Sequence, residues 1–171
     1  TGFGVAWRQG TISLPRQAVV AEGLSGKASY DPAKERPLAA DYAIATIRHD
    51  RPRPLVVPLR ATGRAEGNPF GTMNFDARLV DAAGRMAVEV SGEQDIGTGA
   101  GSVGVDVPPV PFPPDGPGLT GLFPMLGEWV ETVSGTFGLD GRYAWGEGSG
   151  KGSASILVED AAVETGGIRA Q

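Results

Sequence analysis

The sequence contains no cysteine, a single histidine and few aromatic residues. Without cysteine the chain has no disulfide, no thiolate nucleophile and no metal site built on thiolates. His49 is the lone histidine, so no histidine cluster can hold a metal, and a Ser–His pair would have to use this one residue. Nothing near it in the sequence completes a triad. We therefore predict that the chain is not an enzyme and needs no metal or cofactor.

The chain also lacks an excess of positive charge and any long apolar run. Its 15 Lys and Arg face 20 Asp and Glu, and the net charge of −5 argues against nucleic acid as a partner. No stretch approaches the roughly 20 apolar residues that a membrane-spanning helix needs. The sequence has no starting Met and no signal peptide, so we expect it to be a segment of a longer protein.

Glycine and proline, in contrast, are abundant, with 27 and 14 residues. Without a collagen-like period, this composition indicates either disorder or a turn-rich all-β protein. Sustained alternation of apolar and polar residues favours the second. The alternation is longest over residues 134–158, where the Gly-rich sequence GEGSG predicts a hairpin between two long strands. The apolar side chains of these strands share one face: Phe137, Leu139, Tyr143, Trp145, Ile156 and Val158.

A meander of three strands is predicted upstream, over residues 72–107. Its apolar positions alternate with polar ones, and turns rich in Gly and Ala separate the strands, so all three apolar faces can lie on one side. These positions are Met73, Phe75, Leu79, Met86, Val88, Val90, Val103, Val105 and Val107. Further strands are predicted over 2–14, 17–30, 41–48 and 56–64. In the first of these the alternation changes phase at residues 8–10, which indicates a bulge or a tight hairpin.

A proline-rich segment follows the meander. Residues 108–117 (PPVPFPPDGP) are predicted as a stiff connector, because proline cannot donate to the ladder of a central strand. Apolar residues at three- and four-residue steps then predict one short amphipathic helix, beginning near Pro124 and ending near Glu131. The expected organisation is one β-rich segment over 1–171. It comprises a meander at 1–107, the connector at 108–117, the helix within 118–131, and a hairpin with a tail at 132–171.

Two local motifs have plain structural interpretations. Residues 99–104 match G-x-G-x-x-G by letter, but they lead into a strand and a proline rather than a helix, so we expect no dinucleotide site. The basic cluster Arg48, His49, Arg51 and Arg53 is most simply a solvated turn, with a site for an anionic head group or partner as the alternative.

Many one-sided strands create a continuous apolar face that must be hidden from water. Each large side chain that becomes buried contributes about 1.5 to 3 kcal/mol, so a fully exposed face is untenable. The sequence leaves three covers open. A second sheet would make a sandwich, the sheet could curl into a half-open trough filled by acyl chains, or neighbouring segments could cap it as in a solenoid.

Residues 122–167 (LFPMLGEWVETVSGTFGLDGRYAWGEGSGKGSASILVEDAAVETGG) resemble the C-terminal part of the AsmA-like superfamily, especially its YdbH and TamB branches. The shared pattern is a short amphipathic helix, a strand opening with Ser-Gly-Thr, a Gly-containing polar turn, and a strand ending in Leu157-Val158-Glu159-Asp160 before a late Gly-Gly. Trp7–Tyr30 is similar to another such unit. The proline-rich connector is heavier than this pattern leads us to expect.

The resemblance implies a taco-like, strongly curved β-sheet that forms a long hydrophobic groove. It also implies a protein that spans the periplasm, is anchored to the inner membrane by a segment outside this chain, and guides phospholipids between inner and outer membranes. Its partners would be phospholipid acyl chains, with membrane components engaged by regions outside this segment. The apolar residues named above would line the groove, and the helix would cap one end. The alternative is a non-enzymatic structural or adhesive module, a β-sandwich or solenoid, of an exported protein.

Overall fold

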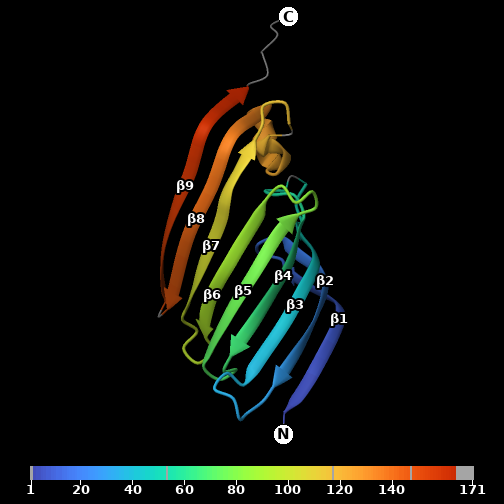
Figure 1. The fold of residues 1–171 in the computed structure, drawn as a ribbon, viewed down its shortest axis with the longest axis vertical. Helices are drawn as coiled ribbons and strands as arrows, with labels where there is room; N and C mark the ends of the chain where they lie inside the picture. The colour runs from blue at the N-terminus through green and yellow to red at the C-terminus, as the bar shows by residue number, and fades with distance from the viewer. Residues whose placement is uncertain (1, 53, 117, 147, 165–171) are drawn as a thin grey trace, which may run out of the picture.

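The computed structural model describes residues 2–52, 54–116, 118–146 and 148–164, which form one antiparallel sheet (Figure 1). Strand order follows chain order: β1 (Phe3–Leu14), β2 (Val19–Tyr30), β3 (Leu38–His49), β4 (Leu59–Gly67), β5 (Thr72–Asp81), β6 (Ala87–Asp95), β7 (Gly101–Phe112), β8 (Thr132–Gly146) and β9 (Ser149–Glu164). Within these residues β1 and β9 do not pair with each other, so the sheet is open. The predicted mainly-β fold of long antiparallel strands, curved like a groove, is confirmed.

Each strand expected from the alternation is present, and the ambiguous phase change in the first strand is resolved. The phase change in β1 is a bulge, because Trp7 pairs with Gly26 and Gly10 with Leu24, and Gln9 between them has φ 61°. The C-terminal hairpin forms as predicted, with Gly146 opposite Ser149. Residue 147 of the GEGSG turn, and residues 165–171 of the predicted tail, lie outside the described residues.

The proline-rich segment differs from its prediction, because its first half belongs to a strand. β7 continues through Phe112 and pairs with β8 over that stretch, after a bulge between Val107 and Val110. β6 pairs with β7 only as far as Asp106. Beyond that residue β7 is an edge strand within the described chain, and an edge needs no N–H donor, so proline is tolerated. The connector is reduced to residues 113–116, since Pro117 lies outside the described residues.

The helical segment is also shorter than predicted. Two 3₁₀ turns, η1 (Leu119–Gly121) and η2 (Pro124–Glu128), replace the single amphipathic helix. Their hydrogen bonds span three residues, as in Trp129 N–H to Leu126 O at 3.0 Å. Pro124 has no N–H to bond to the preceding turn, so the two pieces cannot join into one helix.

The hydrophobic core of the described chain lies at one end of the sheet. It is built on four buried residues, Leu59, Met86, Phe112 and Leu122. Leu122 belongs to the short segment between η1 and η2, and it is fully buried. Partly buried residues of the sheet that pack against this cluster are Leu79, Val88, Val107, Val110 and Phe137. The η1–η2 segment therefore caps the sheet at this end, beside the end of β7 (Figure 1).

Candidate functional site

Strand pairing places the predicted groove residues on one face of the sheet. Directly opposed residues of neighbouring antiparallel strands point to the same side. The opposed pairs run across the second half of the sheet: Leu79 with Val88, Val90 with Val105, Val103 with Tyr143, Val107 with Leu139, Leu139 with Ile156, and Phe137 with Val158. Met73, Phe75 and Trp145 lie at alternate positions on the same strands, and Met86 joins this face through the core. This set of residues is the apolar face.

The apolar face continues over β1–β4, where the predicted lining named no residue. The register adds two layers: Val5, Trp7, Ile12 and Leu14 of β1 are opposite Ala28, Gly26, Ala21 and Val19 of β2, and Tyr42, Ile44 and Ile47 of β3 are opposite Gly63, Ala61 and Leu59 of β4. Alternation within these strands was visible in the sequence. Their phase relative to the other strands was not, because register is a property of the pairing.

Large aromatic side chains of the apolar face lie over glycines of the neighbouring strand. The opposed pairs are Trp7 with Gly26, Tyr42 with Gly63, Phe75 with Gly92, Trp145 with Gly101, and Tyr143 with Gly152. A Cβ at Gly92 would stand 2.5 Å from Phe75 Cζ, and one at Gly26 2.6 Å from Trp7 Cζ2. Each ring therefore occupies the space that a side chain would fill, which covers the exposed glycine backbone and keeps the ring low on the sheet.

Tyr42 is an example of a ring that lies across the neighbouring strand, close to the backbone of the sheet. It crosses Gly63 of β4, and its hydroxyl donates to the carbonyl oxygen of Asp76 on β5 at 3.2 Å. Burial, followed by the negative charge of Asp76, raises the pKa of the Tyr42 hydroxyl. The hydroxyl stays a neutral donor, and the ring is fixed parallel to the surface that it covers.

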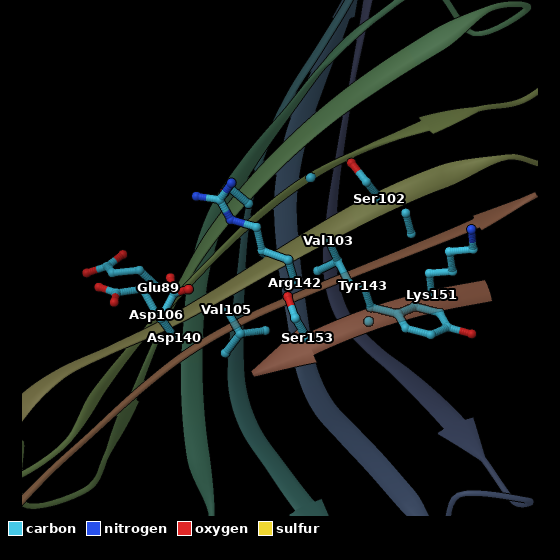
Figure 2. A pocket seen from close by; sticks show the side chains of 15 residues that line it. Glu89, Ser102, Val103, Val105, Asp106, Asp140, Arg142, Tyr143, Lys151 and Ser153 are labelled. Carbon is cyan, nitrogen blue, oxygen red and sulfur yellow. The ribbon is translucent and has the colours of Figure 1, made fainter. Parts of the chain in front are cut away.

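The opposite face of the sheet is polar and carries exposed ion pairs. Lys27 Nζ lies 3.5 Å from Asp41, and Arg78 lies 2.5 Å from Glu89. Over β6–β8 three carboxylates, Glu89, Asp106 and Asp140, oppose one another in a row. Figure 2 shows these carboxylates gathered at one end of a shallow hollow. In the described residues, no group of three or more acidic, His or Cys side chains is arranged to hold a metal ion.

The apolar face has little cover from the described protein. The accessible surface is 11209 Å², whereas a compact protein of 17.6 kDa exposes about 7,900 Å². On the two edge strands large apolar side chains are well exposed, with Phe3 at 65% and Ile156 at 70%. Contiguous apolar surface of this kind marks an interaction site, because isolated soluble proteins avoid it.

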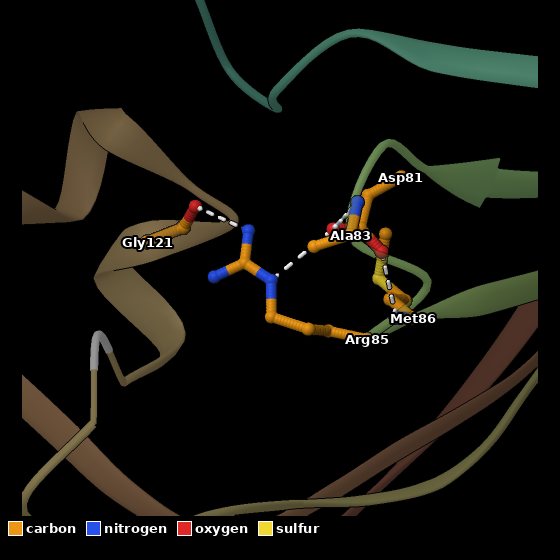
Figure 3. A network of polar contacts seen from close by, with 5 residues as sticks. All are labelled: Asp81, Ala83, Arg85, Met86 and Gly121. Atoms are coloured by element: carbon orange, nitrogen blue, oxygen red, sulfur yellow. Dashed lines mark hydrogen bonds and ion pairs between the residues drawn. The ribbon is translucent and has the colours of Figure 1, made fainter.

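A polar network holds the η1–η2 cap at its end of the apolar face (Figure 3). The Asp81 carboxylate, 1% exposed, accepts hydrogen bonds from Met86 N–H at 2.9 Å and Arg85 Nε at 3.1 Å. Arg85 also donates to Gly121 O at 3.2 Å. Burial raises the pKa of Asp81, but these bonds, with that from Ala83, outweigh it, so the pKa lies below its ordinary value. Asp81 is therefore an ionised anchor for the arginine that reaches the cap.

The basic cluster at residues 48–53 divides between the two faces of the sheet. Arg48 is opposite Val20 and bonds Asp50 at 2.8 Å and Glu22 at 3.4 Å, and these hydrogen bonds raise the pKa of its guanidinium. His49 is opposite Val19 on the apolar face. Arg53 lies outside the described residues. Arg48 and His49 are thus the last residues of β3 rather than part of a turn, and of the described cluster only Arg51 lies in the bend that follows.

Comparison with protein-family models, with curated proteins and with solved structures found no match to this chain. The resemblance to the AsmA-like superfamily therefore stays a prediction. Of the helical turns in the described ranges, none has the length and apolar character to cross a membrane.

Proposed function

We propose that this chain is a segment of a periplasm-spanning protein that guides phospholipids between inner and outer membranes along the apolar face. The observation that supports it is a face that is apolar across all nine strands, with protein cover at one end only among the described residues. An anchor in the inner membrane, and the components that receive the lipid, would lie outside this segment.

Acyl chains suit this surface because they need no directional polar contacts. Each methylene removed from water contributes about 0.8 kcal/mol, so a partly inserted chain is held without any specific polar residue. Neighbouring strands are about 4.8 Å apart, so nine of them give a face roughly 40 Å wide. That width accommodates several chains side by side, with head groups left in water at the rim.

The flat aromatic rings support passage along the face rather than binding at one point. Rings that lie over Gly26, Gly63 and Gly92 leave no upright side chain at these positions of the floor. A smooth apolar floor offers similar contacts at successive positions, so an acyl chain can move without leaving a deep site. Transport of this kind needs no acid, base or metal.

The test is lipid content. Purified full chain, extracted with organic solvent and also examined by native mass spectrometry, is expected to carry phospholipid, and the delipidated protein is expected to take up a fluorescent phosphatidylethanolamine saturably. Absence of co-purified lipid together with no saturable uptake would overturn the proposal. Of the two forms of the rival structural or adhesive module, sandwich or solenoid, the sandwich would need a second sheet, whereas the described residues form a single one.

A further inference from the structure

Among the described residues, β9 is the more open edge of the sheet. Both edge strands carry a bulge at a non-glycine residue with positive φ, Gln9 in β1 and Asp160 in β9. The bulge of β1 lies in its middle and divides the strand. That of β9 lies near its end and leaves Ser149–Glu159 as one uninterrupted run, which lies along one border of the sheet in Figure 1. A long straight edge presents unpaired backbone donors and acceptors to another strand.

The middle of this run is apolar on both faces. Ile156 and Val158 belong to the apolar face and are 70% and 51% exposed. Leu157, between them, is 39% exposed on the polar face, where its opposed residue is Gly138. A cover over the apolar face alone leaves Leu157 in water. A strand added at the edge shields all three residues together.

We propose that two copies of this chain associate through antiparallel pairing of their β9 strands, about a two-fold axis at Ser155. In this register Lys151 is opposite Glu159 of the second copy, and the same pair recurs across the axis. Each large apolar residue meets a small one: Ile156 opposes Ala154, Val158 opposes Gly152, and Leu157 opposes Ser153 of the second copy. The strand is thus complementary to itself in charge and in side-chain size.

Neighbouring registers are less favourable. A shift by two residues in one direction places Lys151 opposite Ala161 and draws the bulge at Asp160 into the pairing. A shift by two in the other direction places Lys151 opposite Leu157. Because the two-fold axis is perpendicular to the sheet, the apolar faces of both copies lie on the same side and form one continuous surface. The pairing itself does not depend on lipid.

The absence of cysteine makes a direct test possible. Opposed Cα atoms of antiparallel strands are about 4.5 to 5.5 Å apart, which lies within the range that a disulfide spans. Ser155→Cys is therefore expected to give a disulfide-linked dimer under mild oxidation, whereas the matched edge variant Thr11→Cys on β1 is expected to stay monomeric. A mixed disulfide between the two variants would show head-to-tail pairing of β1 with β9 and would overturn the proposal. A wild-type chain that stays monomeric in light scattering at tens of micromolar would also overturn it.

Charge reversal tests the register. Lys151→Glu and Glu159→Lys each replace two attractive contacts with two repulsive ones, and each is expected to raise the dimer dissociation constant on the order of tenfold. The double variant K151E/E159K restores the attraction and is expected to return the constant to the wild-type value. A double variant as weak as either single one would overturn this register. Lipid uptake by the same variants keeps the dimer and the lipid proposal separate, because loss of one leaves the other measurable.

Discussion

The lipid affinity of the variant Ile156→Asp tests whether the apolar face binds lipid or is simply exposed to water. Ile156 is opposite Leu139 on the apolar face and is 70% exposed, so little of its side chain contributes to folding. Substitutions at such exposed positions usually change stability by about 0.5 kcal/mol or less. A full burial of isoleucine is worth about 1.5 to 3 kcal/mol, so the exposed part leaves roughly 1 to 2 kcal/mol for lipid contact.

The aspartate enlarges this loss, because a carboxylate buried against acyl chains has no partner. We therefore expect lipid affinity to fall at least about tenfold, since 1.4 kcal/mol corresponds to a factor of ten. Titration of delipidated protein with a fluorescent phospholipid measures the affinity, and thermal denaturation checks the fold. Ser153→Asp is the matched control, because it places the same charge on the same strand but on the polar face, and its lipid affinity is expected to stay at the wild-type value.

A second variant distinguishes an effect of the apolar face from an effect confined to β9. Val5→Asp on β1 is 55% exposed on the same face, and it is expected to weaken lipid binding as Ile156→Asp does. Equal losses in Ile156→Asp and Ser153→Asp would point to charge rather than to the apolar face. Unchanged affinity in both apolar-face variants, with the fold intact, would refute the reasoning.

Three further outcomes are expected. Gly92→Ala is expected to destabilise the fold by about 1 to 3 kcal/mol in chemical denaturation, because the new Cβ would stand 2.3 Å from the backbone oxygen of Ser102 and 2.5 Å from Phe75 Cζ; a neutral effect would show that neither atom lies so close to the glycine. Leu122→Ala is expected to lose about 2 to 5 kcal/mol, as for a large-to-small core change, and a surface-like value would contradict the capped end. Because the folded pKa of Asp81 is depressed, its contribution to stability is present above the unfolded pKa and is lost as pH falls through the folded value. Asp81→Asn is therefore expected to show a smaller loss of melting temperature between pH 7 and pH 3 than the wild type, and an equal loss would rule out this role.

The strands could be predicted from the sequence because alternation is a local signal. Apolar and polar residues recur at period two along each strand, so the strands within 72–107 and 134–158 can be predicted without reference to the rest of the chain. The complete apolar face could not be predicted. β4 contributes Ala61 and Ala65, which are too small to stand out in the sequence, and β3 gives a weaker pattern. Strand pairing supplies this part of the site.

Two local predictions from the sequence differ from the structure. Proline excludes a central strand, but the stretch after Asp106 is not central, because β6 stops pairing there. Apolar spacing around Leu122 and Leu126 predicted one amphipathic helix, whereas the segment forms two 3₁₀ turns that cap the core. The aromatic–glycine pairs escaped prediction, since each joins residues of different strands.

The two faces of the sheet differ in polarity, and this difference limits which kind of partner can cover the apolar face. The polar face is already suited to water, because pairs such as Lys27 with Asp41 and Arg64 with Glu66 balance charges that remain solvated. Within the described residues the apolar face offers no comparable set of exposed ion pairs, so a partner cannot be oriented there by ion pairs. A protein surface would have to match the floor in shape along its whole length, whereas acyl chains adapt to it and slide. We therefore propose a fluid, apolar cover for this surface.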